Sequence, residues 1–528
     1  MCGIAAIHPR RSAEASDAEP CPGPGTVQQR GARMLDRLAH RGPDDVDARR
    51  VGASWLGHRR LSLLDLEGGR QPLTGPEESE TAWTLVCNGE IYNDPELRAR
   101  YGDDQYLTTS DSESALVALR TEGAAGLARL GGMWALCAAT PDGRFLAARD
   151  RIGIKPLFWA RTPEAVHFAS ELRAFDADVQ PYAEMFPPGH WWTPEDGLHR
   201  FAEPVPERAA ADVWDGVSAR VQEKATHEVV ADSVRRHLRA DVEVGVFLSG
   251  GLDSSLVAAV AAEEYAAQGR TLKTFAVGTP DSPDLLAARE AAAHLGTEHH
   301  EALLDAESAT AALDEVVAGV ENFDAGLIRS AVPNWFLSQL AARHVKAVLT
   351  GEGADELFAG YGYYHREHAD PEALDAELRR SVGLLHGLNL QRCDRVTMAH
   401  GLEARVPFLD SDVIAHAMSL PLATKSLEQV GEDPDDVMEK AHLRRSFAGY
   451  LPDRLLWRRK VQFGTGSGAG SLLTPYWEEQ LDDDELTAAR RESGVPLRSK
   501  EELAYYRAFR RALPKVRVEK VLTRFAEG

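Results

Sequence analysis

The pattern of secondary structure changes once along this 528-residue chain, near residue 205, and no other feature constrains the fold as much. Before the change, short segments that often alternate in polarity predict strands at residues 83–87, 133–140, 144–149, 156–161 and 165–170. After it, apolar segments at residues 242–248, 274–277 and 345–350 predict strands of a parallel sheet, separated by alanine-rich helices at residues 256–268 and 285–294. The chain is also too long for one ordinary core, so two domains are predicted, residues 1–205 and 206–528.

Charge and composition exclude several classes of function. The chain carries 59 basic and 82 acidic residues, a net charge of −23 that would repel nucleic-acid phosphates over most of the surface. No stretch approaches the ~20 apolar residues of a membrane span. The five cysteines are odd in number and contain no C-x-x-C pair, which fits a reducing cytoplasm and disfavours a thiolate zinc site. We therefore expect a cytoplasmic protein with no nucleic-acid and no membrane partner.

A cysteine stands second in the chain, in Met1-Cys2-Gly3-Ile4. Removal of the initiator methionine would give Cys2 a free α-amino group, whose reference pKa is about 7.7–8.0. Part of that amine is unprotonated near neutral pH and can take the proton of the thiol. Cys2 is therefore a candidate nucleophile, although the tetrapeptide alone is equally typical of a cysteine without a catalytic role.

Three segments downstream have the chemistry that amide hydrolysis needs. Asn88 and Gly89 follow a predicted strand, and a side-chain amide next to a backbone N–H can form an oxyanion hole. Arg60 could bind a free carboxylate through two parallel hydrogen bonds. Glu90 and Asp111 could hold an α-ammonium group. Each segment alone is just as typical of a turn or of a solvated charge.

In the second half, Ser249-Gly250-Gly251-Leu252-Asp253-Ser254-Ser255 lies between a predicted apolar strand and an alanine-rich helix. Glycines let the backbone approach a phosphate, and a helix N-terminus supplies unpaired N–H donors. The alternative is a turn that only caps the helix. The chain has no G-x-x-x-x-G-K-[S/T] segment, which disfavours a Walker-type NTPase.

A second acidic segment, Thr350-Gly351-Glu352-Gly353-Ala354-Asp355-Glu356, follows another predicted strand. Open α/β sheets bind ligands at the carboxyl ends of their strands. Asp253 and Asp355 are the carboxylates that we expect to hold Mg²⁺ against phosphates, because Mg²⁺ prefers oxygen ligands. The histidines of the region have no organised acidic or thiolate partner in the sequence and are expected to be structural or close to the nucleotide: His294, His299 and His300.

The first half resembles the class II glutamine amidotransferase domain, an N-terminal-nucleophile hydrolase with an α-β-β-α sandwich fold. The matching segments are Cys2-Gly3-Ile4, His40-Arg41-Gly42-Pro43-Asp44, Arg60-Leu61-Ser62, Asn88-Gly89-Glu90-Ile91-Tyr92-Asn93, Ser110-Asp111 and residues 148–157. The resemblance implies that Cys2 forms a glutamyl thioester and that Asn88 and Gly89 stabilise the oxyanion. It also implies that glutamine is bound by Arg60, Asn88, Glu90 and Asp111.

The remaining cysteines of this half match no catalytic position. They are Cys21, Cys87 and Cys137. Cys87 and Cys137 lie in predicted strands and are expected to be small core residues.

The serine-rich loop of the second half resembles the pyrophosphate loop of N-type ATP pyrophosphatases, which cleave ATP to AMP and pyrophosphate. The rest of this half is similar to the synthetase domain of asparagine synthetases, an α/β fold with a parallel sheet. The matching residues are Glu321, Asp324, Arg329, Ser330, Gly360-Tyr361, Asp394-Arg395, residues 398–410, Lys460 and Gln462-Phe463.

That resemblance assigns roles to residues of this chain. The implied ATP-binding residues are Leu248, Ser249, Gly250, Gly251, Asp253, Ser254, Ser255, Val277, Thr350 and Gly351, with Leu248 and Val277 beside the adenine. Glu352 would accept a proton from the attacking ammonia, and Lys460 would neutralise charge on the departing pyrophosphate. Arg329 and Asp394 would bind the acceptor.

Two departures from the family pattern concern the acceptor. Where the family commonly has D-x-T-T-x-R, this chain has Asp324-Ala325-Gly326-Leu327-Ile328-Arg329, which removes two hydroxyls and adds an apolar side chain. After Lys460 it has Val461-Gln462-Phe463-Gly464 in place of an acidic, serine-rich stretch. We expect a weaker hold on aspartate or a preference for a larger, less polar carboxylate. The following run, residues 464–470, is rich in glycine and is expected to be a flexible loop.

The predicted function is that of a glutamine-hydrolysing asparagine synthetase that uses glutamine, Mg²⁺-ATP and aspartate or a related carboxylate, with a homodimer as a compatible assembly. Ammonia would pass inside the protein between the two sites. An alternative is an amidotransferase of secondary metabolism that acts on a different carboxylate. A β-lactam-synthetase-like ring closer needs no ammonia, so the presence of Cys2, Asn88 and Arg60 disfavours it. A non-catalytic homologue is disfavoured because the residues of both sites are present.

Overall fold

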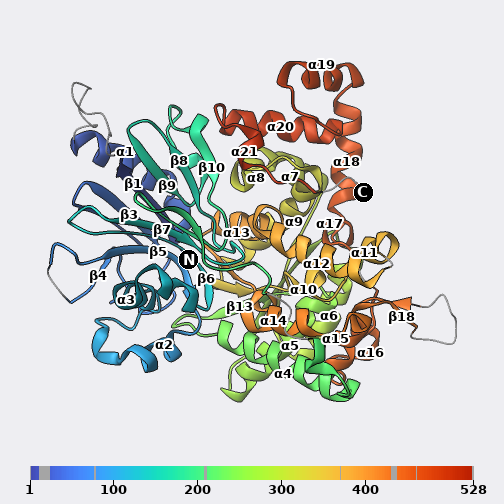
Figure 1. Cartoon of the computed structure of the whole chain (residues 1–528). Coiled ribbons are helices and arrows are strands. Elements are labelled where there is room, and N and C mark those ends of the chain that lie inside the picture. The colour runs from blue at the N-terminus through green and yellow to red at the C-terminus, as the bar shows by residue number, and fades with distance from the viewer. Residues whose placement is uncertain are drawn as a thin grey trace.

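The computed structural model describes residues 2–10, 24–76, 79–206, 211–368, 370–429, 437–459 and 461–525. An N-terminal lobe built mainly of strands lies beside a C-terminal lobe in which helices surround a sheet (Figure 1). The predicted domain boundary at residue 205 stays a prediction, since residues 207–210 of the linker are outside the described residues. In the described part of the chain, no helix is long and apolar enough to cross a membrane.

Two antiparallel six-stranded sheets form the N-terminal lobe. The first has, in spatial order, β10 (Ala183–Met185), β8 (Phe158–Arg161), β9 (Ala165–Ala169), β1 (Cys2–Pro9), β3 (Ser54–Arg60) and β2 (Asp45–Val51). The second has β12 (Gly197–Arg200), β11 (His190–Thr193), β7 (Phe145–Arg149), β6 (Gly132–Ala139), β5 (Thr84–Ile91) and β4 (Leu73–Thr74). The strands predicted from residue 83 to residue 170 are β5 to β9, with ends that agree to within four residues.

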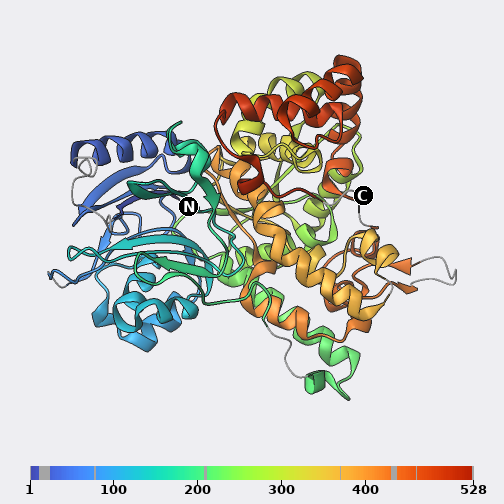
Figure 2. The same cartoon turned by 45° about the horizontal axis from the view of Figure 1, so that its top comes forward.

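The two sheets pack face to face, with helices on their outer sides. On β1, Ile4 and Ala6 point into the layer between the sheets, whereas Ala5 and Ile7 face the outside. Both faces are apolar because α1 (Pro24–Arg37) covers the outer one. In the second sheet, α3 (Ser112–Glu122) packs on β5, and α2 (Asp94–Tyr101) packs beside α3. Figure 2 shows the stacked layers. The expected α-β-β-α sandwich is confirmed.

The predicted core cysteines lie in this sandwich. Cys87 faces the layer under α3, and Cys137 lies between the sheets. Both are completely buried, and burial raises the pKa of each thiol. Their expected role as core residues is confirmed, whereas Cys21 lies outside the described residues.

A five-stranded parallel sheet organises the C-terminal lobe. Its spatial order is β15 (Glu298–Leu303), β14 (Lys273–Gly278), β13 (Val244–Phe247), β16 (Ala347–Leu349) and β17 (Glu403–Arg405). Three of these strands, β13, β14 and β16, are the predicted ones. The crossovers run through α5 (Leu252–Ala267), α6 (Pro283–Leu295) and α9 (Ala325–Ala341). The expected parallel α/β domain is confirmed.

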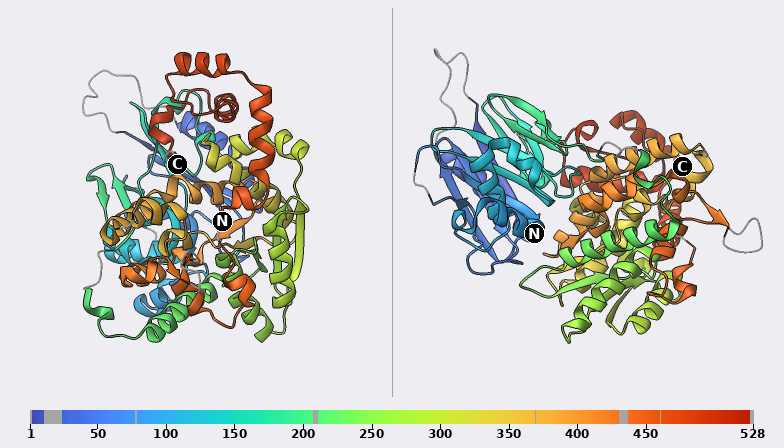
Figure 3. Two further views of the ribbon diagram at one scale, coloured as in Figure 1. Left: turned by 90° about the vertical axis from the view of Figure 1, so that its right-hand side faces the viewer. Right: turned by 60° about the horizontal axis from the view of Figure 1, so that its bottom comes forward.

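Further helices surround this sheet (Figure 3). They are α4 (Ala219–His237), α7 (Ala306–Ala311), α8 (Leu313–Val320), α10 (Ala354–Leu357), α11 (Gly362–Glu367), α12 (Pro371–Leu384), α13 (Asn389–Met398), α14 (Ser411–Ser419), α15 (Ala441–Ser446), α16 (Asp453–Leu456), α17 (Phe463–Gly466), α18 (Ala469–Gln480), α19 (Asp483–Ser493), α20 (Lys500–Ala512) and α21 (Val518–Val521). A short hairpin pairs β18 (Glu428–Gln429) with β19 (Val437–Met438).

The glycine-rich run at residues 464–470 is largely helical, so the expectation of a loop is wrong. It contains most of α17 and the first two residues of α18. The glycines give close packing: a Cβ on Gly466 would lie 2.1 Å from Asp284 Oδ2. Ser467 is fully buried, and its carbonyl accepts a hydrogen bond from Thr279 N at 3.0 Å. Local composition suggested a loop, whereas the run is largely helical and packs against the segment before α6.

Candidate active sites

Cys2 and Asn88 meet between the two sheets of the sandwich. Cys2 begins β1 and is 8% exposed, and its backbone N–H donates to Asn88 Oδ1 at 3.0 Å. Asn88 lies within β5 of the opposite sheet. Burial raises the pKa of the Cys2 thiol. A nucleophilic thiolate at this position therefore needs an adjacent base.

The two predicted oxyanion donors are in place. The Nδ2 of Asn88 is buried and has no hydrogen-bond partner among the described residues. Buried amide donors are rarely left unpaired, so this one is available to a ligand. Gly89 has φ of +155°, and a Cβ there would lie 2.0 Å from Met133 O on the neighbouring strand. Glycine is therefore required beside Asn88.

Arg60 lies at the end of β3, opposite Cys2 in the register of the sheet. Its guanidinium donates to the carbonyl oxygens of Leu64, Asp65 and Leu66 at 3.2, 2.5 and 3.0 Å. The loop after β3 thus fixes the orientation of this side chain. Nη1 and Nη2 both donate to this loop, so a bound carboxylate would compete with it for them.

The two acids of the predicted glutamine site are buried. Asp111 Oδ2 accepts from Ile91 N at 2.6 Å, and burial raises the pKa of Asp111 to about 6. Burial, followed by the nearby Glu403 carboxylate, raises the pKa of Glu90 well above its ordinary value. A cationic group bound between Asp111 and Glu90 would favour their ionised forms. This is the environment expected for an α-ammonium ligand.

The C-terminal lobe contributes two residues here that sequence reasoning did not assign. Arg405 and Glu403 project from β17, and their side chains pair through Nε and Oε1 at 2.6 Å. Arg405 Nη2 also lies 3.2 Å from Glu90 Oε2. Burial alone would raise the pKa of Glu403, but nearby positive charges, among them those of Arg405 and Lys155, lower it to about 2. Two signals were available: the spacing of Glu403 and Arg405 on one face of a short strand, and their place in the family-matching segment at residues 398–410.

A buried ion pair joins the lobes beside Cys2. Arg41 Nε donates to Cys2 O at 3.1 Å, and its two terminal nitrogens donate to both oxygens of Asp394 at 2.8 and 3.2 Å. Arg41 also pairs with Glu171 at 2.8 Å. Asp394 therefore lies at the interface between the lobes, and its engaged carboxylate gives no support to the prediction that it contacts the acceptor.

The predicted phosphate loop connects β13 to α5. Gly250 has φ of +68°, and a Cβ there would lie 2.5 Å from Ala287 C, so the loop packs directly on α6. Ser254 Oγ accepts from Ser249 N at 3.2 Å, which closes the loop. Ser255 Oγ is buried and without a partner among the described residues. The loop is therefore rigid and retains an unpaired hydroxyl.

The second acidic segment lies against this loop. A Cβ on Gly351 would be 2.9 Å from Asp253 Cβ and from Ser254 N, so only glycine lets the two segments approach. Asp253 and Asp355 converge on one cation, the ammonium of Lys440, at 2.7 and 2.5 Å. Two converging carboxylates are a donor set that Mg²⁺ accepts, so the predicted pair fits this ion.

These segments line a cavity of about 2010 Å³ in the C-terminal lobe. The predicted site residues that line it are Leu248, Ser249, Gly251, Asp253, Ser254, Val277, Arg329, Thr350, Gly351, Glu352 and Asp355. Gly250, Ser255 and Asp394 do not line it. Lys460 lies outside the described residues, so its predicted role stays a prediction.

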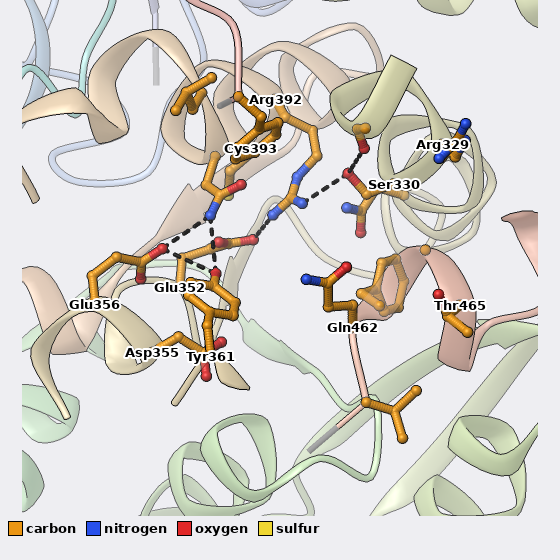
Figure 4. Close-up of a pocket in the computed structure, with 18 of the residues that line it drawn as sticks. Arg329, Ser330, Glu352, Asp355, Glu356, Tyr361, Arg392, Cys393, Gln462 and Thr465 are labelled. Atoms are coloured by element: carbon orange, nitrogen blue, oxygen red, sulfur yellow. Dashed lines mark hydrogen bonds and ion pairs between the residues drawn. The ribbon is translucent and has the colours of Figure 1, made fainter. Parts of the chain in front are cut away.

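Arg392, on α13, is a second site residue that sequence reasoning missed. Figure 4 shows its guanidinium between Glu352 and Ser330. It forms a short ion pair with Glu352 and donates to Ser330 Oγ at 3.0 Å. Its nitrogen donors face the cavity, where a carboxylate ligand would compete with Glu352 for them.

Arg329, the predicted acceptor-binding arginine, is held from one side by the C-terminal helices. Glu501, on α20, is 1% exposed and accepts from Arg329 Nε at 2.9 Å and from Arg329 Nη2 at 2.5 Å. Thr474 and Tyr505 donate to the same carboxylate at 3.1 and 2.7 Å. Glu501 thus uses one edge of the guanidinium and offsets part of its charge.

The departure at Leu327 has less effect on the cavity than the sequence suggested. Leu327 is fully buried in the core, and its backbone N–H donates to Asp324 Oδ1 at the start of α9. Of the two replaced positions only Gly326 lines the cavity. The expectation that an apolar side chain is added to the acceptor site is wrong, because the first turn of α9 directs that side chain into the core.

The histidines of β15 take no part in either site. Among the described residues, one group of potential metal ligands brings its atoms within 4.8 Å of one another: Glu298, His300 and His344. The two imidazole rings stack with centroids 4.1 Å apart and 30° between their planes. The nitrogen lone pairs of stacked rings do not point at one common position, as the binding of one metal ion would require. His300 Nε2 also contacts Glu298 at 2.8 Å. The arrangement fits the structural role expected for His299 and His300.

Comparisons with known proteins bear on both lobes. The family model described as "Glutamine amidotransferase domain" matches residues 1–187, and "Asparagine synthase" matches residues 225–382 and 366–523. A protein of Schizosaccharomyces pombe named "Probable asparagine synthetase (glutamine-hydrolyzing)" is 36% identical, over 96% of this chain and 92% of its own length. "Asparagine synthetase B (glutamine-hydrolyzing)" of Escherichia coli is also 36% identical, over 88% of this chain and 84% of its own.

A comparison with solved structures gives a weaker likeness. Glutamine phosphoribosylpyrophosphate amidotransferase from B. subtilis is 17% identical with a TM-score of 0.33, and the match covers 57% of this chain and 81% of that chain. A likeness of this size adds nothing to the fold already described.

Proposed function

The chain belongs to the family of glutamine-hydrolysing asparagine synthetases, and we propose from this premise that it makes asparagine from aspartate, glutamine and ATP. One structural observation supports the proposal above the others. The neighbouring parallel strands β16 and β17 serve different sites: Glu352 after β16 lines the large cavity, and Arg405 on β17 reaches Glu90 beside Cys2. One pair of neighbouring strands thus connects the site around Cys2 with the large cavity.

Glutamine hydrolysis is assigned to the N-terminal lobe. After removal of Met1, the α-amine of Cys2 takes the thiol proton, and the thiolate attacks the amide carbon of glutamine. Asn88 Nδ2 and Gly89 N–H stabilise the oxyanion. The carbon–nitrogen bond breaks, the amide nitrogen leaves as ammonia with the proton from the thiol, and water hydrolyses the thioester to glutamate. Glu90, Asp111 and Arg60 hold the amino and carboxylate groups.

Amide formation is assigned to the cavity. A side-chain carboxylate oxygen of aspartate attacks the α-phosphorus of ATP, and pyrophosphate leaves. Ammonia then attacks the acyl carbon, Glu352 accepts a proton from it, and AMP leaves. Adenylation is needed because an oxide is a poor leaving group. Mg²⁺, held by Asp253 and Asp355, would neutralise phosphate charge when bound. Lys460 would assist the departing pyrophosphate.

We assign acceptor binding to Arg329 and Arg392. Both guanidinium groups reach the cavity, and each is partly compensated by a glutamate, Glu501 or Glu352. A carboxylate entering the cavity would take over hydrogen bonds from Glu352 at Arg392, and it would bind Arg329 at the edge that Glu501 does not occupy. Arg392 replaces Asp394 in our assignment. A homodimer and a cytoplasmic location stay predictions.

The test is the conversion of aspartate to asparagine with [amide-¹⁵N]glutamine and Mg²⁺-ATP, followed by mass spectrometry. We expect ¹⁵N-labelled asparagine, AMP and pyrophosphate in equal amounts. Formation of glutamate without asparagine at saturating aspartate would contradict the proposed acceptor. A panel of other carboxylates would then identify the substrate.

A further inference from the structure

Lys440 lies between two carboxylates of the proposed ATP site, those of Asp253 and Asp355. Its Nζ lies 2.7 Å from each carboxylate oxygen of Asp253 and 2.5 Å from Asp355 Oδ1. The lysine is only 2% exposed, although it lines the cavity. Burying a lysine is costly unless opposite charges compensate its ammonium group, and these two carboxylates supply that compensation.

The backbone at this residue is also unusual. Lys440 has φ of +56° and precedes α15 as its N-terminal cap residue. A left-handed conformation is unfavourable for a residue other than glycine, so the surroundings must enforce it. It aims the side chain away from the helix that follows and toward Asp253 and Asp355.

Gly360 makes room for this arrangement. A Cβ at that position would lie 2.1 Å from Lys440 Cε and 2.0 Å from Asp355 Oδ1. Glycine is therefore required at position 360, because a side chain there would collide with both Lys440 and Asp355. Three segments far apart in sequence thus cooperate to place one ammonium group: the phosphate loop, residues 355–360 and the start of α15.

A metal ion and this ammonium compete for the same carboxylates. Mg²⁺ binds oxygen at about 2.0–2.1 Å, so an ion shared by Asp253 and Asp355 would lie close to the position of Nζ. Two cations so close together repel strongly in a buried site. Lys440 must therefore move when the metal binds, and the anionic groups that arrive with the metal are the phosphates of ATP.

We propose that Lys440 is a positioning residue that acts as a resident counter-ion. In the nucleotide-free enzyme it holds the two carboxylates together and keeps divalent cations out, and it transfers to phosphate oxygens when the metal enters with ATP. This inference rests on the proposed function, which assigns Asp253 and Asp355 to Mg²⁺. Its consequence is that metal and nucleotide bind together, not in succession.

The test measures Mn²⁺ binding to the full-length protein without nucleotide, by electron paramagnetic resonance of the free ion. Lys440→Met removes the ammonium and keeps an unbranched side chain. We expect it to bind Mn²⁺ at least tenfold more tightly than the parent protein, because two carboxylates lose their cation. Adding Asp355→Asn to this variant should remove the gain. An affinity within twofold of the parent value would overturn the proposal.

Two further variants guard against misfolding and separate the outcomes. Lys440→Gln, which is polar, should show the same gain, whereas Lys440→Arg keeps the charge and should bind Mn²⁺ as weakly as the parent. Equal gains in the glutamine and arginine variants would refute the role of charge. Near-ultraviolet circular dichroism checks the fold of each variant. Asparagine formation by the parent protein tests the proposed function separately, so failure of one does not imply failure of the other.

Discussion

At the scale of single residues, Asn88 uses both ends of one side-chain amide. Its Oδ1 accepts from the backbone of Cys2, and this contact orients Nδ2 as an unpaired buried donor. The amide thus couples the position of the nucleophile to the position of the oxyanion. Cys87, its neighbour in the chain, shares the burial but faces the core under α3.

Replacing Asn88 by alanine should lower kcat for glutamine hydrolysis about 100- to 1000-fold, because one lost oxyanion donor typically costs ~2.7–4 kcal/mol. KM should change much less, since the donor acts mainly on the transition state. Glutamate release measures both constants.

Cys2→Ala should abolish glutamine hydrolysis while ammonia-dependent asparagine synthesis continues. Cys87→Ala is the matched control and should retain hydrolysis. Glutaminase activity in Cys2→Ala at the parent rate would disprove the assignment.

Buried histidines make stability depend on pH. Burial lowers the pKa of His58 and of His237 to about 3, whereas the unfolded chain has about 6.5. Below pH 6.5 the unfolded state binds protons that the folded state does not. Each group therefore lowers the free energy of unfolding as pH falls from 6.5 toward 3, by at most about 1.4 kcal/mol per pH unit.

We expect His237→Asn to lose less stability than the parent protein between pH 7.5 and pH 5.5, measured as the urea midpoint. Burial raises the pKa of Asp111 and Glu356 to about 6 and 7, so these acids change stability in the opposite direction over this pH range. They are present in both proteins, and the difference between the two pH dependences therefore reports on His237. The exposed His199→Asn is the control and should follow the parent. Identical pH dependence in all three proteins would argue against a buried neutral His237.

At the scale of elements, α20 supports the acceptor site from outside it. Its first turn carries Glu501, and its apolar face, with Leu503 and Phe509, packs into the core. Tyr505 lies one turn further along and donates to the same carboxylate. The helix therefore fixes Glu501, which in turn fixes Arg329.

Glu501→Ala should raise KM for the acceptor at least tenfold, since Arg329 loses the partner that orients it. Glutamine hydrolysis occurs in the other lobe and should be unchanged. The measurement is asparagine formation against aspartate concentration, with glutamate release in parallel. Glu485→Ala on α19 removes an exposed ion pair with Arg507 and should have no effect on either constant. An unchanged KM in Glu501→Ala would show that Arg329 needs no such support.

At the scale of the whole molecule, the lobes are joined by buried charges. Arg41 of the N-terminal lobe pairs with Asp394 of the C-terminal lobe, and both are almost fully buried. Removing one partner of a buried pair typically costs 3–5 kcal/mol when the other charge is left uncompensated. Arg41 would keep its ion pair with Glu171, which reduces this cost. Lys346 and Asp44 form a second pair across the lobes at 2.7 Å, but these side chains are 42% and 27% exposed.

Asp394→Ala should therefore lower the free energy of unfolding by about 3 kcal/mol, the lower end of that range, and Lys346→Ala by about 1 kcal/mol or less. Urea unfolding measures both. The first variant should also lower the amount of asparagine formed per glutamate released, because ammonia escapes when the lobes separate. A ratio equal to that of the parent protein would show that this pair does not maintain the coupling.

The sequence by itself determined the two folds and most of the chemistry. Strand polarity, the apolar strands of the second half and the glycine-rich loops are local patterns, and each is enforced by backbone geometry that the structure retains. Cys2, Asn88, Asp253 and Asp355 could be named because their neighbours along the chain define their setting. The pairing of Asp253 with Asp355 followed from a general property of parallel sheets.

Only the tertiary structure decided which charges meet. Three contacts illustrate this, and each joins residues that lie 40 to 315 positions apart in the sequence. They are Arg405 with Glu90, Arg392 with Glu352, and Lys440 with Asp253 and Asp355. Tertiary packing also accompanies the helical structure of residues 464–470, directs Leu327 into the core and places Asp394 at the contact between the lobes. Burial of charge depends on what the fold places opposite it, and no local pattern in the chain records that partner.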